Sequence, residues 1–274
     1  MSSKPSWDLV DSHCHINFDE FDHDRRQVLE RAWENGIRRI LNPGIDIETS
    51  KTAFKYSSYY PQIYVAVGVH PNSGLSWTQN SRSELIQLAA HKKVVAIGEI
   101  GLDYYRNHSP RDLQQSIFTQ QLELATELDL PVVIHNREAS EDILEILHQW
   151  HQSLQANESR LAGHPGVLHS FSGSLEFAQE IVSLNFKIGI NGPVTFRNSQ
   201  TLQSVVSNLP LENLLVETDS PFLSPHPFRG KRNEPANVRI VAEKVAELKS
   251  ISVNQVAECT TKEADKLFNW REIH

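Results

Sequence analysis

Six side chains of types that bind metal ions each stand at the end of a short apolar run in this chain. The runs are WDLVDSHCH, VVAIGE, PVVIH, GVLH and NLLVETD, and the side chains are those of His13, His15, Glu99, His135, His169 and Asp219. Runs of this length, bounded by polar residues, are typical of buried β-strands. Side chains so far apart in sequence meet only where strand ends converge, so one pattern constrains both the fold and the chemistry.

Eight apolar runs alternate with amphipathic stretches along the whole chain. Strands are expected near residues 7–13, 37–42, 63–69, 94–99, 131–135, 166–169, 186–190 and 213–218. Helices are expected near residues 22–35, 47–60, 81–91, 112–129, 139–151, 175–184, 199–207 and 235–248, with a final helix near 253–269 that packs outside the barrel. Eight strand–helix repeats predict an α/β fold, a single (β/α)8 TIM barrel that makes one domain of residues 1–274.

An open, doubly wound sheet is the alternative fold. The candidate ligands follow the first, fourth, fifth, sixth and eighth expected strands. In a closed barrel the carboxyl ends of all strands face one mouth, whereas the first and last strands of an open sheet usually lie far apart. The positions of the ligands therefore favour the barrel, with the metal site at the C-terminal mouth of the strands.

Net charge and cysteine content limit the classes of protein to which this chain can belong. The formal net charge of −8 does not attract nucleic acid over a long range, which argues against a high-affinity, non-specific DNA-binding protein. The two cysteines, Cys14 and Cys259, favour a reducing compartment such as the cytoplasm. No apolar run approaches the ~18 residues of a membrane span, and the first residues lack the apolar segment of a signal peptide. A monomer is the default expectation.

Thirteen histidines prompt a search for metal ligands, although most need no special role. Seven lie in polar helices or loops and are expected to be exposed to solvent, namely His23, His91, His108, His148, His151, His226 and His274. A single histidine at a strand end is also more often a satisfied polar residue than a ligand. The metal hypothesis depends on the joint pattern of six side chains.

We expect Glu99 to bridge two divalent ions and to take part in catalysis. The other ligands divide into two sets, His13, His15 and Asp219 for one ion and His135 and His169 for the other. Imidazole suits zinc and carboxylates suit magnesium or manganese, so the sequence leaves Mg, Mn and Zn open. Such a pair of ions generates a hydroxide at neutral pH, with Asp219 as the expected general base. Glu217 and His70 are further candidates, either as additional ligands or as supports for neighbouring ligands.

Cations and aromatic rings near the expected mouth suggest how a substrate is held. Candidate phosphate-binding side chains lie in loops after strands, namely Arg106, Arg137, Arg229, Lys231 and Arg232. Candidates for stacking on a base are Tyr104, Tyr105 and Phe171. Gly189 and Gly192 frame Asn191 in a loop of a kind that often binds phosphate in barrels. Surface ion pairs and packing at the barrel rim are the alternatives for these residues.

Seven segments spread over nearly the whole chain carry a family likeness. They are DSHCHINF (11–18), GVHP (68–71), GEIGLDYYR (98–106), PVVIHNREA (131–139), LHSFSGS (168–174), GINGPVTF (189–196) and ETDSPFLSPHPFRGKRNEP (217–235). In these segments the chain resembles the TatD family of metal-dependent deoxyribonucleases, within the amidohydrolase-like barrels. The resemblance implies a (β/α)8 barrel with a divalent-metal site that hydrolyses phosphodiester bonds of DNA, often as a 3′→5′ exonuclease. The family's ligand positions fall on the six candidates above.

Departures from the family pattern are small. Asn72 stands where a second histidine often follows GVHP, and HSFSG stands in place of HCFSG. Neither change affects a candidate ligand, so both bear on substrate preference. Many barrels of the wider superfamily bridge their metals with a carboxylated lysine, and Glu99 takes that place here.

Three functions are compatible with these residues. The leading hypothesis is a divalent-metal-dependent hydrolase of DNA phosphodiester bonds, a 3′→5′ exodeoxyribonuclease acting on single strands or a 3′ end through a metal-activated hydroxide. The second is a metal-dependent hydrolase of a small amide, ester or lactone, including deacylase activity, because the same hydroxide attacks a carbonyl. The third is a non-catalytic binding protein, which a missing ligand would favour. No candidate ligand is missing, and the cationic RGKR stretch at 229–232 favours a phosphate substrate.

Overall fold

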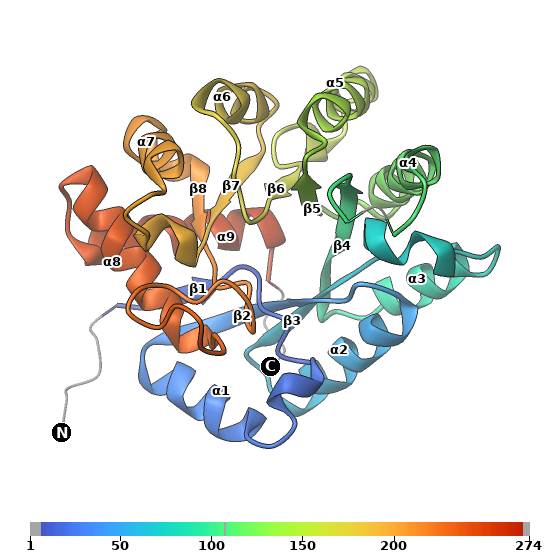
Figure 1. Cartoon of the computed structure of the whole chain (residues 1–274). Helices are drawn as coiled ribbons and strands as arrows, with labels where there is room; N and C mark the ends of the chain where they lie inside the picture. Colours follow the sequence, from blue (N-terminus) through green and yellow to red (C-terminus); the bar gives the residue numbers. More distant parts are fainter. Residues whose placement is uncertain (1–6, 107, 271–274) are drawn as a thin grey trace.

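The computed structural model describes residues 7–106 and 108–270. Eight parallel strands form one sheet in the order of the sequence, with helices around it (Figure 1). The strands are β1 (Leu9–Asp11), β2 (Ile37–Pro43), β3 (Ile63–Val67), β4 (Val94–Asp103), β5 (Val132–Arg137), β6 (Gly166–Leu168), β7 (Lys187–Ile190) and β8 (Leu214–Val216). The predicted TIM barrel is confirmed.

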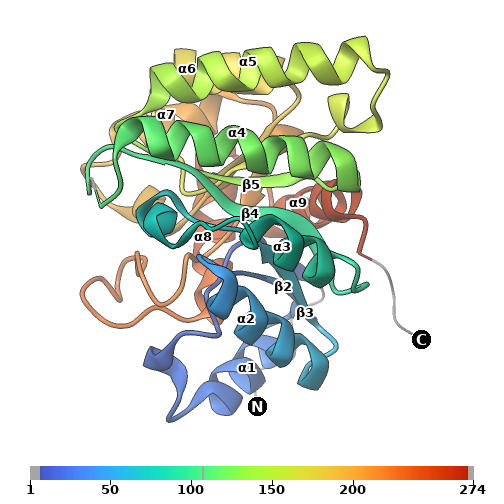
Figure 2. The same cartoon turned by 90° about the vertical axis from the view of Figure 1, so that its right-hand side faces the viewer.

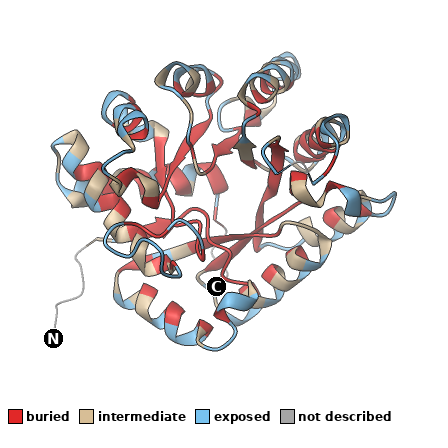
Figure 3. Cartoon of the chain, in the orientation of Figure 1, coloured by how far each residue is buried: buried red, intermediate tan, exposed pale blue. Residues whose placement is uncertain are grey.

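Helices follow the strands in the expected alternation. In the described residues they are α1 (Arg25–Glu34), α2 (Ile47–Tyr59), α3 (Ser81–Ala89), α4 (Arg111–Leu128), α5 (Ser140–Ala156), α6 (Leu175–Ser183), α7 (Gln200–Asn208), α8 (Val238–Lys249) and α9 (Val253–Phe268). Their inner faces are buried and their outer faces are exposed (Figure 3). Over these residues no helix combines the length and the apolar character that crossing a membrane requires.

Helix α5 is longer than the sequence pattern predicted. It continues to Ala156, beyond the expected end near residue 151, because Leu147, Trp150 and Leu154 extend its buried stripe. His151 lies on that buried side, with its Nε2 atom 3.1 Å from the carbonyl oxygen of Ala162. The expectation that His151 is exposed is therefore wrong.

The other histidines of that group divide as follows. His148 is partly buried, His274 lies outside the described residues, and the remaining four are exposed, namely His23, His91, His108 and His226. None of the described members of the group enters the metal centre characterised below, which agrees with the ordinary roles expected for them.

The ring of strands closes between β1 and β8, just beyond the ends of both strands. The Asp219 N–H donates to the His13 carbonyl oxygen at 2.8 Å, and the His15 N–H donates to the Ser220 carbonyl oxygen at 2.8 Å. A parallel bridge between Cys14 and Ser220 accompanies these bonds. Closure of the barrel therefore also joins the two segments that carry three of the candidate ligands.

Alternate strand residues face opposite sides of the sheet. One set packs against the helices, and the other set, which includes Val10, Leu41 and Val133, fills the inside of the barrel. Phe268, the last residue of α9, and Trp270, two residues beyond it, belong to this inner cluster. Helix α9 lies across the end of the barrel opposite the loops that follow the strands (Figure 2). The expectation that the final helix packs outside the barrel is therefore wrong for its last turn.

A buried ion pair also ties α9 to the base of the barrel. The Nζ atom of Lys187, in β7, lies 2.7 Å from a carboxylate oxygen of Glu263, and both side chains are at most 10% exposed. Lys187 also donates to the Glu212 carbonyl oxygen at 2.6 Å. Buried charges are tolerated when they are paired and hydrogen-bonded, as both are here. The base of the barrel is therefore closed by the chain itself.

Candidate metal centre

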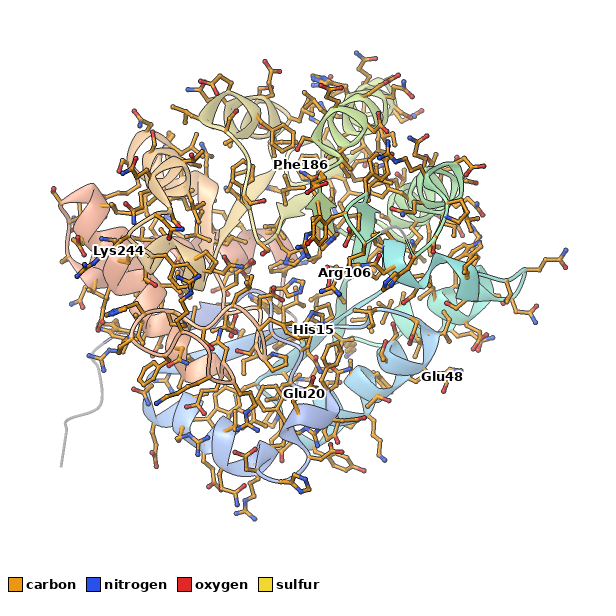
Figure 4. All side chains as sticks on the ribbon, viewed as in Figure 1. His15, Glu20, Glu48, Arg106, Phe186 and Lys244 are labelled. Carbon is orange, nitrogen blue, oxygen red and sulfur yellow. The ribbon has the colours of Figure 1, made fainter. Side chains whose placement is uncertain are left out.

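Most of the candidate ligands lie just beyond the ends of short strands. His13 and His15 follow β1, His169 follows β6 and Asp219 follows β8, whereas His135 lies within β5. Viewed along the barrel axis, His15 lies near the centre of the ring (Figure 4). Because all strands are parallel, these side chains gather at one end of the barrel.

Glu99 reaches the same place from inside a strand. Strand β4 continues to Asp103, so the expectation that Glu99 ends its strand is wrong. The pairing of β4 with β5 shifts register between Ile97 and Ile100, and the Glu99 N–H donates to the Gly44 carbonyl oxygen at 2.9 Å. The irregularity surrounds Glu99, which is 3% exposed and whose carboxylate lies between the histidines.

The first ligand cluster contains four of the expected side chains, His13, His15, Asp219 and one oxygen of Glu99. The Nε2 atoms of His13 and His15 lie 3.1 Å apart, and Oε2 of Glu99 lies 3.4 Å from each. Asp219 Oδ1 is 3.8 Å from the His13 nitrogen and 3.7 Å from the His15 nitrogen. These four groups surround one position with nitrogen and oxygen donors.

The second ligand cluster uses the other oxygen of the same carboxylate. Oε1 of Glu99 lies 2.8 Å from His169 Nε2 and 3.0 Å from His135 Nδ1, and these two nitrogens are 3.4 Å apart. The rings of His13 and His169 stack at 3.8 Å, which places the two clusters side by side. The structure thus brings all six candidates together, with one oxygen of Glu99 directed to each cluster.

The donor atoms fit divalent cations. Two facing imidazole nitrogens at 3.1 Å attract one another only when a proton or a cation lies between them, because a bare nitrogen offers only a lone pair. This applies to the His13–His15 pair and to the His135–His169 pair. Three histidine–carboxylate groups have ligand atoms within 4.8 Å of one another. Such mixed nitrogen and oxygen sets suit zinc and manganese, with magnesium accepted through the carboxylates.

Burial and mutual charge shift the pKa values of these groups. Burial alone raises the pKa of Glu99, but the imidazoles of His169 and His70 outweigh it and hold the pKa well below its usual value. Burial, reinforced by the charge of His169, lowers the pKa of His13. Burial raises the pKa of Asp219 to about 6, against the opposing charge of His169. The centre therefore combines an anionic bridge with a neutral His13 imidazole, the form that binds a metal.

Asp103 is a member of the site that the sequence analysis missed. Its Oδ2 atom lies 3.2 Å from His135 Nε2, on the side of the ring opposite Glu99. Asn72 donates to the same oxygen at 2.9 Å, and the Arg106 N–H donates to Oδ1 at 2.8 Å. A carboxylate behind a ligating imidazole fixes the ring orientation and increases its basicity. Asn72, a departure from the family pattern, therefore helps to hold the support of a candidate ligand.

Asp103→Asn is expected to weaken divalent-metal binding by about 10–100-fold, the usual effect of losing such a support. The amide keeps the size of the side chain but lacks the charge that stabilises His135 as an electron donor. Competition between the protein and a fluorescent chelator measures the affinity. Glu258→Gln, which removes an exposed carboxylate on α9, is the matched control. Unchanged affinity would restrict Asp103 to holding the loop after β4.

His70 and Glu217 contact the centre in ways that favour support over ligation. The Asn72 N–H donates to Nδ1 of His70 at 3.0 Å, so the imidazole proton resides on Nε2, 3.3 Å from Glu99 Oε1. Glu217 accepts the Ser170 N–H at 2.6 Å and lies 3.7 Å from Nδ1 of His169, behind that ring. His70 is thus placed as a hydrogen-bond donor to Glu99, and Glu217 as a support for His169.

All five predicted phosphate-binding cations are exposed, and four of them lie over aromatic rings, including Arg232 over Phe21 at 4.7 Å. Arg137 lies 4.0 Å above the Tyr105 ring, and Arg229 and Lys231 lie over Phe196 and Phe228 at 4.6 Å and 5.9 Å. Arg106 projects toward the centre of the barrel in the axial view (Figure 4). These contacts leave the charged groups at the surface, where an anion can reach them.

Arg232 is engaged differently from the other cations. Its terminal nitrogens lie 2.8 Å and 2.6 Å from the two carboxylate oxygens of Asp24, and one of them donates to the Glu20 carbonyl oxygen at 2.6 Å. This forked ion pair fixes the loop after β8 to the segment before α1. The geometry therefore favours a structural role for Arg232, and its contact with phosphate stays a prediction.

The three aromatic candidates also differ. Phe171 is 3% exposed and stacks on Phe177, which favours packing at the rim, the alternative to stacking on a base. Tyr104 is partly buried, with its hydroxyl donating to Asp142 at 2.5 Å, and packs at the barrel rim. Tyr105 is 57% exposed but carries Arg137 over its ring. A further exposed ring, Phe222, was not singled out from the sequence.

The loop after β7 faces protein groups. Asn191 donates to the Ser170 hydroxyl at 2.8 Å and is buried. A side chain on Gly189 would collide with the Glu217 carboxylate, and one on Gly192 would collide with the Leu223 carbonyl oxygen. These glycines therefore allow close packing beside the centre, and a phosphate contact at this loop stays a prediction.

A barrel whose mouth holds paired clusters of histidine and carboxylate is typical of metal-dependent hydrolases. A sequence model of the family described as TatD related DNase matches residues 10–269, and the chain belongs to this family. The Bacillus subtilis (strain 168) protein "Uncharacterized metal-dependent hydrolase YabD" is 43% identical over 260 residues, which cover 95% of this chain and 98% of that protein.

Two further similarities bear on function and fold. The "3'-5' ssDNA/RNA exonuclease TatD" of Escherichia fergusonii is 34% identical over 266 residues, covering 95% of this chain and 98% of that protein. The crystal structure of YjjV, a TatD homologue from Escherichia coli K12, matches with a TM-score of 0.87 at 32% identity, over 95% of this chain and 98% of that chain. The chain is therefore a metal-dependent hydrolase of the TatD family.

Proposed function

We propose that the protein hydrolyses phosphodiester bonds of DNA, as a 3′→5′ exonuclease on single strands or 3′ ends. The observation that carries the proposal is the Glu99 carboxylate, which directs one oxygen to each of two ligand clusters less than 4 Å from it. Paired metal sites of this kind are characteristic of nucleases and phosphatases. The name of the Escherichia fergusonii relative supports nucleic acid as the substrate.

Two divalent ions, Mg, Mn or Zn, are the proposed cofactors. His13, His15 and Asp219 would hold one ion, His135 and His169 the other, and Glu99 would bridge them. When bound, such a pair activates water at neutral pH and neutralises charge on a phosphate. The fit rests on the donor sets of this chain, in which two pairs of imidazole nitrogens converge on the two oxygens of Glu99.

The chain's own residues supply proton transfer and orientation. Asp219 Oδ1 borders the first cluster and is placed to accept a proton from the attacking water. The Nε2–H of His70 donates toward Glu99 Oε1 and orients the bridging carboxylate. Arg106 and Arg137, exposed beside the mouth, are placed to hold non-bridging phosphate oxygens.

Digestion of end-labelled oligonucleotides tests the proposal. Protein stripped with a chelator is supplied with Mg²⁺, Mn²⁺ or Zn²⁺ and given the same single strand labelled at its 5′ end. A ladder that shortens one nucleotide at a time from the 3′ end, and that disappears when the chelator is restored, is the expected result. Hydrolysis of a small ester, amide or lactone without cleavage of DNA would instead assign the centre to carbonyl substrates.

Three further predictions belong to the proposal. We propose that residues 1–274 form one domain, that the protein works as a monomer and that it resides in the cytoplasm. Cys14 is buried and Cys259 is partly buried, and both are free thiols, which supports a reducing compartment. Sedimentation of the purified chain tests the monomer, and fractionation of cells tests the location.

A further inference from the structure

Phe222 is an exposed aromatic ring held beside the first ligand cluster. It is 47% exposed, although large apolar side chains are usually covered. Its ring centroid lies 6.4 Å from that of His15 and 6.2 Å from that of Phe18. Phe18 stacks on His15 at 4.5 Å, so the three rings form one aromatic group that ends at the surface with Phe222.

The position of Phe222 is fixed by the backbone around it. The Phe222 N–H donates to the Asp219 carbonyl oxygen at 2.8 Å, which places the ring one turn away from a candidate ligand. The Asn233 N–H donates to the Pro221 carbonyl oxygen at 2.9 Å and holds the start of the same loop. The ring is thus presented to solvent by a hydrogen-bonded turn.

Phe222 differs from the other rings at the mouth in its surroundings. Tyr105 and Phe228 each have a cation over the ring, Arg137 at 4.0 Å and Lys231 at 5.9 Å. Among the cation–ring contacts of the described residues, none involves Phe222. The mouth therefore offers cations on one part of its rim and an uncharged ring on another.

These two kinds of surface match the two halves of a nucleotide. A phosphate is anionic and pairs with the cations and the metal centre, whereas a base is planar and uncharged and stacks on an aromatic ring. The spacing also fits, since Phe222 lies within three residues of Asp219 along the chain and contacts the ring of His15. A phosphate at the centre thus brings its own base next to Phe222.

We propose that Phe222 is the stacking platform for the terminal base of a single-stranded nucleic acid. This inference rests on the proposed function and deepens it, because it names the nucleobase as a recognised group. Every base presents a flat aromatic face, so the platform accepts all bases with little sequence preference. The adjoining phosphate then lies at the centre formed around Glu99.

Kinetics with two matched substrates test the platform. One oligonucleotide carries a base at its end, and the other carries an abasic residue there. Phe222→Ala is expected to lower the ratio of kcat/KM for the base-bearing over the abasic substrate by about tenfold, mainly through KM. Phe222→Trp should keep the ratio. Tyr59→Ala removes a ring that is 64% exposed at the end of α2 and is the control that should leave the ratio unchanged.

A binding measurement separates this inference from the proposed function. An oligonucleotide ending in 2-aminopurine is mixed with the metal-loaded Asp219→Asn protein, and its fluorescence should be quenched by stacking. Adding Phe222→Ala to that protein should remove the quenching. The wild-type protein could cleave DNA while Phe222→Ala left both the quenching and the kinetic ratio unchanged. That result would overturn the stacking role of Phe222 and leave the proposed function standing. A self-association lost with Phe222→Ala would also overturn it, by assigning the ring to a second copy of the chain.

Discussion

Asp219→Asn is expected to lower kcat for oligonucleotide cleavage by about 10²–10⁴-fold at saturating metal, the usual contribution of a general base. The amide has nearly the same shape but cannot accept a proton at Oδ1, which lies 3.8 Å and 3.7 Å from the nitrogens of His13 and His15. Rates are measured with the end-labelled substrate over a series of metal concentrations, so that weaker metal binding is separated from slower chemistry.

The control for this result is Glu258→Gln, which removes an exposed carboxylate from α9 at the other end of the barrel. It should keep the wild-type rate. A circular dichroism spectrum and melting temperature close to those of the wild type would show that Asp219→Asn is folded. Near-normal cleavage by the folded variant would remove Asp219 from the role of base.

Glu99→Gln is expected to reduce the metal bound per chain and to abolish cleavage at ordinary metal concentrations. Its two oxygens face different clusters, at 3.4 Å from His13 and His15 and at 2.8 Å and 3.0 Å from His169 and His135. The amide removes the charge shared by both positions and offers only one oxygen. Because losing even an outer support costs about 10–100-fold in affinity, a bridging ligand should cost at least as much.

Elemental analysis after gel filtration measures the metal content, and titration against a chelator measures the affinity. Asp103→Asn provides the comparison, because that variant should weaken one position while the bridge remains. Two ions per chain bound by Glu99→Gln with wild-type affinity would contradict the bridging arrangement. Loss of both ions together would show that the two positions are filled cooperatively through Glu99.

The fold was predictable because its signals are local. Each buried strand produces an apolar run, and each covering helix produces an apolar stripe, as in α4 with Ile117 and Leu124 buried. The helix ends were less certain, since the Leu147, Trp150 and Leu154 stripe of α5 extends past the polar residues that suggested its end. Which side of the barrel α9 covers depends on contacts with distant strands, and no local pattern encodes it.

The candidate ligands were predictable for a different reason. Six imidazoles and carboxylates each follow an apolar run that predicts a barrel strand. Because the ends of these strands face one mouth, the joint pattern predicts a single metal centre there. Asp103 had a detectable signal, because it lies four residues after Glu99 on the same strand face. The register shift in the pairing of β4 with β5 has no comparable signal in the sequence. The strand was therefore predicted to end at Glu99.

The surroundings of the centre could not be predicted in the same way. The burial of Phe171 and the exposure of Phe222 depend on how neighbouring loops pack, although both rings follow strands. The forked contact of Arg232 with Asp24 joins residues about two hundred positions apart. Exposure and ion pairing of this kind emerge only from the assembled loops.

Phe268 and Trp270 fill the barrel beneath the strands, so the substrate of the exonuclease proposed above would reach the centre from the side of the loops that follow the strands. The incoming strand, the departing nucleotide and the solvent all share the opening above the centre, since the opposite end is filled by the chain's own helix. In the proposed reaction the shortened strand would have to advance by one nucleotide after every cut while the product leaves through the same opening. For the proposed exonuclease we therefore expect added mononucleotide to slow repeated digestion by occupying this shared opening.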